Sequence, residues 1–531
     1  MIILRAAFAA GMALFASAAD LPSGARFEQS TCPITLPSSL AVDCGVLIVP
    51  ENRIKDNGHT VSLPVAIVRS KSPSPSSDPI VYVTGGPAFN EIEPFSMEFI
   101  ATLPFAADRD FIFYNQRGVG FSEPRLGCPE FDNARTAAFP RDPTPEQYFA
   151  AVTACRDRLQ EEEIQLDAYN SSEDAADLRD LRIALGYPEW NIFTISAGGI
   201  IPLTLMQLYP EGIRSVILDS AAGTIYTWRG PDAIGAMNRN LEMVFAHCLT
   251  NVLCNAAYPN LRQRFYERVH ILRAQPVTIS SPVAGGSTSE FTIDGDHLLN
   301  DIAQCTDPGC ATMLPGLMDL AAKGDIAGVY DAFLGGGELT PPDPVDAFLS
   351  EGKSGVYHCH DAIAFEPNSE LVQAAHELPE FRVSLLTLRF IYVPTNTKEA
   401  CKIWRVGRAK SDQHETVTSS IPTLVLAGKW DNVVSPLHSQ ELARTLSNSF
   451  FFEFPGVGHV TLFWGDCPNQ IAAEFIDAPS VAPDSSCISN MADPDFTPTF
   501  LGAPTSTTVR DRNRLPSGSV PMGSRRKFTN R

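Results

Sequence analysis

The segment Thr194-Ile195-Ser196-Ala197-Gly198-Gly199 decides the fold that this sequence predicts. It lies between a short apolar run, Asn191-Ile192-Phe193, and an apolar helical stretch from Ile200 to Tyr209. A tight turn from strand to helix would push the Ser196 hydroxyl out above a sheet and aim the first amides of the helix at the same place. The pattern is close to the nucleophile elbow G-x-S-x-G, with Thr194 where the first glycine is expected. Taken alone, the segment also fits an ordinary glycine-rich turn.

Strand and helix patterns alternate on both sides of this turn. The strands that we expect in the first part cover residues 46–49, 62–68, 80–83, 111–114, 191–193 and 215–218. The first two resemble an opening hairpin, and those at 80–83 and 111–114 are nearly all apolar, as strands buried on both faces of a parallel sheet are. A helix is expected from Ser171 to Leu185, with Ser171 or Ser172 as its cap and Gly186 at its end. This alternation predicts an α/β fold of the α/β-hydrolase type, with a mostly parallel sheet.

The alternation stops near Ala222 and resumes with the strands expected at 422–426 and 450–454. Helical stretches dominate the block between, so we interpret residues 222–418 as an insertion and call it the lid. The 44 residues after Cys487 are rich in Pro, Ser, Thr and Arg and lack periodicity. The predicted organisation is a signal peptide at 1–19, a first core part at 20–221, a mainly helical lid at 222–418, a second core part at 419–487 and a disordered basic tail at 488–531.

Composition and charge exclude some partners and indicate the compartment of the protein. The chain has 531 residues, of which 44% are hydrophobic, and a net charge of −21. Such a negative field repels phosphate groups and anionic lipid, so we expect neither nucleic acid nor a membrane as a partner. Residues 1–19 combine Arg5, an apolar run and the small residues Ala16-Ser17-Ala18, as a cleaved signal peptide does. The apolar run is too short to span a bilayer, and we expect a secreted or periplasmic protein.

The twelve cysteines fit this compartment, because disulfides form in oxidising surroundings. They fall into neighbouring pairs along the chain, and we hypothesise that these neighbours are bonded: Cys32/Cys44, Cys128/Cys155, Cys248/Cys254, Cys305/Cys310, Cys359/Cys401 and Cys467/Cys487. A zinc site is the alternative, but no two CxxC pairs have the spacing of a zinc ribbon. The group His358-Cys359-His360-Asp361 also suggests a metal cluster, although we favour a disulfide for Cys359. We predict no metal and no cofactor.

A serine nucleophile needs a base, and the base needs a carboxylate to orient it. Asp431 follows the expected strand at 422–426, and His459 follows the one at 450–454. This is the chain order Ser, Asp, His that α/β-hydrolases use. Either residue alone could be a loop or surface residue, but the ordered set predicts a catalytic triad of Ser196, Asp431 and His459.

Acyl transfer also requires backbone amides that stabilise an oxyanion. The segment Thr84-Gly85-Gly86-Pro87-Ala88 directly follows the expected strand at 80–83. We predict that Gly86 supplies one amide and Ala197 the other. A plain Gly-Gly-Pro turn is the alternative for this segment.

Several segments together resemble a known family: Ile80 to Ala88, Asn115 to Ser122, the Ser196 turn, Tyr209-Pro210 to Ser220, Asp431 and Gly458-His459. They look like those of the tripeptidyl-aminopeptidase-like α/β-hydrolases, which are relatives of the proline iminopeptidases. The resemblance covers roughly residues 46–467 and is loose in the lid. It implies an exported hydrolase with a helical lid and a C-terminal domain of its own, which releases residues or short peptides from a free N-terminus. It implies Ser196 as nucleophile, His459 as general base and acid, and Asp431 as orienting carboxylate.

The sequence also departs from the family pattern. Thr84 and Ala88 stand at the ends of a motif that is usually His-Gly-Gly-Pro-Gly, and Asn115 stands where the family has Asp. Thr194 and Ala197 replace Gly and Tyr of the usual Gly-x-Ser-Tyr-Gly. An ester, lactone or thioester hydrolase of a secondary-metabolite pathway therefore stays open beside a peptidase, as does a catalytically silent binding protein on the same scaffold.

The expected partner is a small-molecule or peptide substrate, and the sequence leaves the oligomeric state open. An aminopeptidase must pair the ammonium group of its substrate with carboxylates, because a desolvated charge needs a partner. The lid has many acids, including Asp361 and Glu366, and the sequence does not choose among them.

Overall fold

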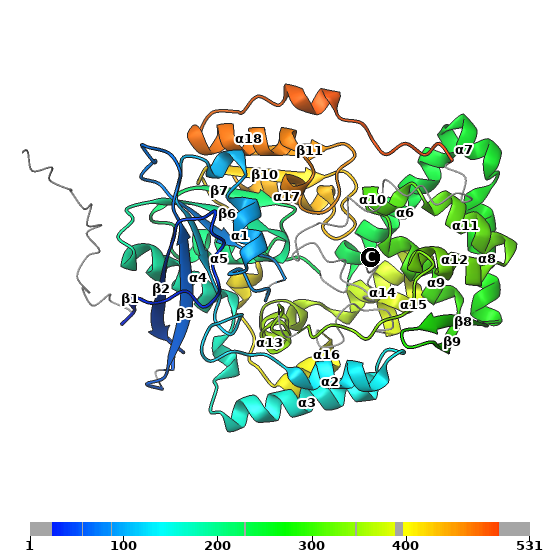
Figure 1. Ribbon diagram of the computed structural model, residues 1–531, viewed down its shortest axis with the longest axis horizontal. Coiled ribbons are helices and arrows are strands. Elements are labelled where there is room, and N and C mark those ends of the chain that lie inside the picture. The colour runs from blue at the N-terminus through cyan, green and yellow to red at the C-terminus, as the bar shows by residue number, and fades with distance from the viewer. Residues whose placement is uncertain are drawn as a thin grey trace, which may run out of the picture.

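The computed structural model describes residues 24–498 except 56, 87, 228–229, 346–347 and 388–396. Figure 1 shows a sheet covered by helices beside a second, mostly helical region. The predicted signal peptide at 1–19 and residues 499–531 of the predicted tail lie outside the described residues. Among the described residues, no helix combines the length and the apolarity needed to cross a membrane.

One nine-stranded sheet forms the centre of the fold, in the order β1-β2-β3-β5-β4-β6-β7-β10-β11. Its strands are β1 (Arg26–Gln29), β2 (Val42–Pro50), β3 (Thr60–Val68), β4 (Ile80–Val83), β5 (Phe111–Tyr114), β6 (Trp190–Ile195), β7 (Ile213–Asp219), β10 (Thr423–Gly428) and β11 (Ser449–Phe454). The strands β1, β2 and β3 pair antiparallel, and β3 is antiparallel to β5. From β5 to β11 all pairs are parallel. The predicted α/β fold with a mostly parallel sheet is confirmed, and so is the opening hairpin.

Helices cover both faces of the sheet because its central strands are apolar on both sides. In β6, Ile192 belongs to one apolar cluster and the next residue, Phe193, to the cluster on the opposite face. The helices of this part are α1 (Pro94–Ile100), α2 (Pro129–Ala138), α3 (Pro145–Glu161), α4 (Ser171–Ala184), α5 (Ile200–Leu208), α17 (Pro436–Thr445) and α18 (Asp466–Asp477). Helices α4, α5 and α17 supply residues to the first cluster, and α1 and α18 supply residues to the second.

Helix α4 matches the predicted helix, but its cap differs. The Asn170 side chain accepts hydrogen bonds from the amides of Ser172 and Glu173, so Asn170 and not Ser171 or Ser172 is the N-cap. Asparagine and serine are comparably good caps, and the helix therefore begins one residue before the position that the serines indicated. Gly186 follows its end with a φ of 78°, as the sequence indicated.

The chain between the paired neighbours β7 and β10 forms the lid. Its helices are α6 (Pro231–Thr250), α7 (Val252–Ala257), α8 (Leu261–Ala274), α9 (Gly295–Gln304), α10 (Pro308–Ala311), α11 (Leu314–Lys323), α12 (Ile326–Leu334), α13 (Glu351–Asp361), α14 (Asn368–Glu377), α15 (Arg382–Thr387) and α16 (Lys398–Trp404). The lid also contains an antiparallel hairpin that the sequence analysis did not predict, β8 (Val277–Val283) with β9 (Ser287–Ile293). Most lid helices enclose an apolar core of their own, whereas α13 and α16 pack into the core of the sheet domain.

All twelve cysteines form disulfides, and the six pairs are those hypothesised from their order along the chain. Cys359 pairs with Cys401, which links α13 to α16. The group around His358 therefore has no thiolate to offer a metal.

Residues 488–498 correct the predicted tail, because they are ordered against the rest of the fold. Asp493 pairs with Lys429 and accepts a hydrogen bond from the Trp430 indole, and Phe496 is 3% exposed. The Phe496 ring stacks 5.4 Å from the ring of His247 on α6. We call residues 488–498 the strap. Its buried aromatic ring and its ion pair hold it against the fold although its composition is typical of disorder, and it links the sheet domain to the lid (Figure 1).

Candidate active site

Ser196 lies in a strained turn at the carboxyl end of β6. It opens the short 3₁₀ segment Ser196–Gly199, its φ is 54°, and it is 6% exposed. A non-glycine residue in the left-handed region costs on the order of 1–2 kcal/mol, so the surroundings must hold it there. Small neighbours allow this, because a Cβ on Gly198 would overlap the Thr84 carbonyl oxygen and one on Gly199 would lie 2.7 Å from the Ala221 Cβ. The turn has the geometry of a nucleophile elbow.

Thr194 occupies the first position of the elbow without distorting it. Its Oγ1 donates a hydrogen bond of 2.8 Å to the Val83 carbonyl, which ties β6 to β4. That Oγ1 would lie 2.8 Å from a Cβ placed on Gly198. The threonine hydroxyl therefore uses space that the glycine leaves open, and the left-handed turn at Ser196 is kept.

Asp431 and His459 follow the two strands beyond β7, and the structure brings both to Ser196. His459 Nε2 lies 2.9 Å from Ser196 Oγ, and His459 Nδ1 lies 2.8 Å from Asp431 Oδ2. The other oxygen of Asp431 accepts hydrogen bonds of 2.8 Å from the amides of Val433 and Val434. Asp431 is fully buried, and these bonds fix the direction in which it faces His459.

Two carboxylates raise the pKa of His459. Burial lowers the pKa of His459, but Asp431 and Asp219 outweigh burial and raise it above its ordinary value of 6.5. Burial raises the pKa of Asp219 to about 6, although the amides of Leu462 and Thr461 favour its ionised form. The imidazolium that forms when His459 takes a proton is therefore stabilised from two sides.

The predicted oxyanion loop packs directly on the serine. A Cβ on Gly85 would lie 2.8 Å from the Ser196 Cβ and 3.3 Å from its Oγ, and Gly86 has a φ of 114°. Only glycine adopts these positions without strain or overlap. Gly86 lies next to Gly85 on this loop and Ala197 follows Ser196 in the chain, and the oxyanion role of their amides stays a prediction.

The lid covers this loop through backbone pairing. The amide of Asn90 donates to the Phe348 carbonyl at 2.8 Å, and the amide of Ser350 donates to the Ala88 carbonyl at 3.0 Å. The rings of Phe89 and Phe348 stack with centroids 6.2 Å apart. The lid segment 348–350 thus packs on residues 88–90, at the end of the loop that carries Gly85 and Gly86.

Asp361 is one of the lid acids that the sequence suggested as a partner for a substrate ammonium group. Asp361 accepts hydrogen bonds from the amide and the hydroxyl of Ser171 and contacts His360, so it is engaged in packing α13 on α4.

The sequence analysis did not single out Glu91, whose Oε1 accepts from the Thr84 amide at 3.0 Å and from Gln116 at 3.1 Å. Its Oε2 is buried and has no hydrogen-bond partner among the described residues. An acid seven residues beyond Thr84 gives no sequence signal that separates it from other loop acids.

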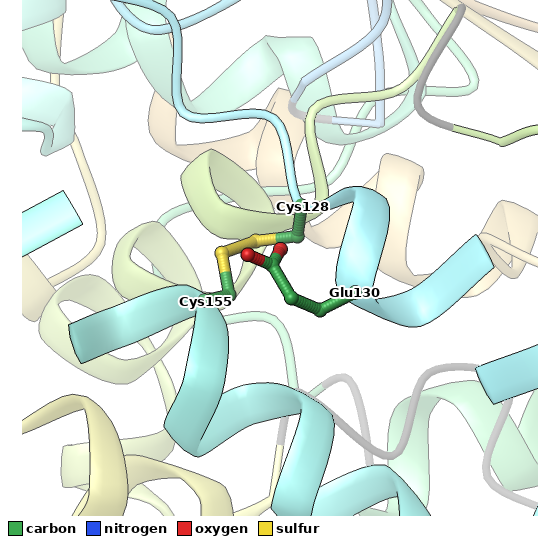
Figure 2. Close-up of side chains that lie close together, drawn as sticks. All are labelled: Cys128, Glu130 and Cys155. Carbon is green, nitrogen blue, oxygen red and sulfur yellow. A yellow bond between two sulfur atoms is a disulfide. The ribbon is translucent and has the colours of Figure 1, made fainter. Parts of the chain in front are cut away.

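One group of potential metal ligands occurs among the described residues: Cys128, Glu130 and Cys155. Figure 2 shows that its two sulfur atoms form a disulfide beside the carboxylate. Glu130 also pairs with Arg158 at 2.8 Å. Because metals bind thiolates and not disulfide sulfurs, this group offers one ligand and does not make a metal site.

Comparisons with known proteins agree with this architecture. Residues 78–276 match a family model described as alpha/beta hydrolase fold, and residues 392–487 match one described as TAP-like protein. The chain is an α/β-hydrolase with a TAP-like C-terminal region. The first match of this α/β-hydrolase begins just before β4 and includes Ser196, and the second includes Asp431 and His459.

Named relatives of this α/β-hydrolase include peptidases. It is 27% identical to the YuaR protein of Escherichia coli K12 over 85% of this chain and 89% of that protein. It is 26% identical to a tripeptidyl aminopeptidase of Streptomyces coelicolor over 39% of this chain and 40% of the aminopeptidase. A solved proline iminopeptidase from Mycobacterium smegmatis is 15% identical, with a TM-score of 0.32 over 79% of this chain and 96% of that one. The match to the alpha/beta hydrolase family and the relatives named as peptidases support a serine hydrolase.

Proposed function

We propose that this serine hydrolase is an exported peptidase that cleaves amide bonds near a free N-terminus, with Ser196, His459 and Asp431 as its catalytic triad. The observation that carries the proposal is the continuous contact from Ser196 Oγ through both His459 nitrogens to Asp431, at 2.9 and 2.8 Å. Nucleophile and base within hydrogen-bond reach, with the base oriented by a third group, is the arrangement that activates a serine.

In the proposed reaction, His459 Nε2 takes the proton of Ser196 as the hydroxyl attacks the substrate carbonyl. Asp431 accepts from His459 Nδ1 and stabilises the imidazolium that forms. The amides of Gly86 and Ala197 donate to the oxyanion, a contribution for which each donor is typically worth about 10²–10³ in rate. His459 then returns the proton to the leaving amine, and water releases the acyl group from Ser196.

The preference for a free N-terminus has two supports. Peptidases occur among the relatives, one of them named for releasing tripeptides. In addition, Glu91 places a buried carboxyl beside the oxyanion loop, with one oxygen that lacks a partner among the described residues. Burial and the nearby Asp174 raise the pKa of Glu91 well above its ordinary value, and a substrate ammonium beside it would favour the ionised form.

Export is supported by the disulfides. All twelve cysteines, spread from residue 32 to residue 487, are bonded in the structure. Such bonds form and persist in the periplasm and outside the cell. Cleavage after residue 18 or 19 is the corresponding prediction for the N-terminus, and N-terminal sequencing of the exported protein tests it.

The specificity is tested with matched substrate sets. We expect turnover of alanyl, prolyl and tripeptidyl anilides, and loss of that turnover when the same substrates are N-acetylated. Faster hydrolysis of short esters and lactones than of any free-amine peptide would instead assign the site to ester chemistry. Absence of turnover on every substrate, together with no reaction with a fluorophosphonate, would favour the catalytically silent scaffold.

A further inference from the structure

We infer that Asp219 and Ser220, at the end of β7, are positioning residues that hold the His459 loop in its reactive place. The inference rests on the proposed role of His459. Neither residue contacts Ser196 through a hydrogen bond that the structure shows, and neither belongs to the predicted triad or oxyanion site. Their place is nevertheless distinctive, because β7 lies between the strand that precedes Ser196 and the strand that precedes Asp431.

Asp219 accepts hydrogen bonds from the amides two and three residues after His459. Its Oδ1 accepts from the Thr461 amide at 2.8 Å, and its Oδ2 accepts from the Leu462 amide at 3.0 Å. These are the first amides of the 3₁₀ segment η7 (Thr461–Phe463), which has no other side-chain cap at its start. Both oxygens of one fully buried carboxylate are thus committed to the loop.

Ser220 holds the residue between His459 and that segment. Val460 has a φ of 63°, which is a strained conformation for a β-branched residue. Its amide donates to Ser220 Oγ at 3.0 Å. Ser220 itself has a φ of 50°, and its amide donates to the Leu426 carbonyl of β10 at 2.8 Å. Strain of this kind persists only where the surroundings over-determine it, and three consecutive amides, from Val460 to Leu462, are held by the end of β7.

Asp219 also acts on His459 through charge. The groups that face Asp219 are His459, the Tyr82 phenol, the Thr461 hydroxyl and the two amides. The groups that raise the pKa of His459 are Asp431 and Asp219. A packing residue without charge would fix the loop but would leave the pKa of His459 unaffected. Asp219 therefore has a signature in the pH profile that a purely structural residue lacks.

The test uses Asp219→Asn, which keeps the shape but replaces one oxygen by an amide group that would face a loop amide. We expect kcat to fall by about 10–100-fold, as a misplacement of about 1 Å near the chemistry can cause, with KM within about twofold. We expect the rate of fluorophosphonate labelling at Ser196 to fall by a similar factor. We also expect the acid limb of kcat/KM to move to lower pH, because His459 loses one of its two carboxylates.

Two further variants keep the test decisive. Ser220→Ala removes only the hydrogen bond to Val460, so it should lower kcat and the labelling rate but leave the acid limb in place. Asp110→Asn is the matched control, since this carboxylate also fixes a loop through a backbone amide, that of Ser70, but at the amino end of β5; its kinetics should match the wild type. If Asp219→Asn does not fold, Ser220→Ala alone carries the prediction for kcat and labelling.

Wild-type kinetics and an unmoved acid limb in folded Asp219→Asn, or wild-type kcat and labelling in Ser220→Ala, would overturn the inference. A wild-type protein that does not react at Ser196 would overturn the proposed function and the inference with it. The two failures are therefore distinguishable, because the first requires a wild type that labels at Ser196.

Discussion

The predicted catalytic edge of the sheet and the lid beside it are fixed in different ways. At the edge, Ser196, Asp431 and His459 stand on short turns after β6, β10 and β11, and backbone amides hold the loops of Asp431 and His459. The lid has an apolar core of its own and joins the sheet domain through separate contacts, among them α13 and the strap at 488–498. The proposed triad takes its three side chains from turns of the sheet domain, whereas lid residues contact the loops around it: Asn240 donates to the Trp430 carbonyl, and Asn432 donates to the Gln304 carbonyl. We therefore expect substitutions at the sheet edge to act on catalysis and those at the lid attachment to act mainly on stability.

The largest effects should come from the sheet edge. We expect His459→Ala to lower kcat by about 10⁶-fold and Asp431→Asn by about 10⁴-fold, because the base and its orientation are lost in turn. Steady-state kinetics on the best substrate measures both. A loss of less than tenfold in either variant, at unchanged thermal stability, would contradict the proposal that His459 and Asp431 carry catalysis at the sheet edge.

The contact between α13 and α4 should dominate the stability of the attachment between lid and sheet domain. Lys353 and Asp174 form a fully buried ion pair of 2.7 Å. Lys353→Ala leaves the Asp174 charge uncompensated, and the free energy of unfolding should fall by about 3–5 kcal/mol. Urea denaturation measures it. The double variant Lys353→Met with Asp174→Leu should recover much of this loss, and a double variant as unstable as the single one would contradict this account of the pair.

The strap should contribute less to the free energy of unfolding than the Lys353–Asp174 pair. Phe496→Ala should lower the free energy of unfolding by about 3 kcal/mol, at the lower end of the range for buried phenylalanine, because Phe496 packs at the end of the described chain. Its kcat should stay near that of the wild type, since the strap contacts Lys429 and Trp430 but not Asp431 itself. A large fall in kcat with unchanged stability would show that the strap belongs to the catalytic edge.

The smallest effect concerns pH. His459 must be neutral to act as a base, and Asp431 and Asp219 outweigh burial to raise its pKa above 6.5. Activity should therefore fall as the pH drops through an apparent pKa above 6.5, and kcat/KM measured from pH 5 to 9 checks it. An acid limb below 6.5 would mean that burial dominates at His459.

The sequence predicts the edge of the sheet better than it predicts the lid and the strap. Apolar strands such as Ile80–Val83 and the residues that follow each strand could be placed from pattern alone, because the carboxyl ends of parallel strands meet at one edge. The hairpin β8–β9 was missed, because its exposed, polar alternation lies inside a helical block. The ordered residues 488–498 were missed because composition does not reveal that Phe496 and Asp493 find partners far away in the chain.

Asp219 and Glu91 show the limit at the site itself. Asp219 follows a predicted strand on the catalytic edge, and that position was a usable signal. Its role, however, depends on where the Thr461 and Leu462 amides point, which only the fold determines. Glu91 lies in a loop whose path depends on the lid residues that pair with it, so no local pattern marks it.

The central claim is that Ser196 is a nucleophile activated by His459. Fluorophosphonate labelling followed by peptide mapping tests it most directly, with the wild type beside Ser196→Ala. We expect one stoichiometric adduct on the peptide that contains Ser196 and none in the variant. Undiminished labelling of Ser196→Ala, or an adduct on another residue of the wild type, would contradict the claim.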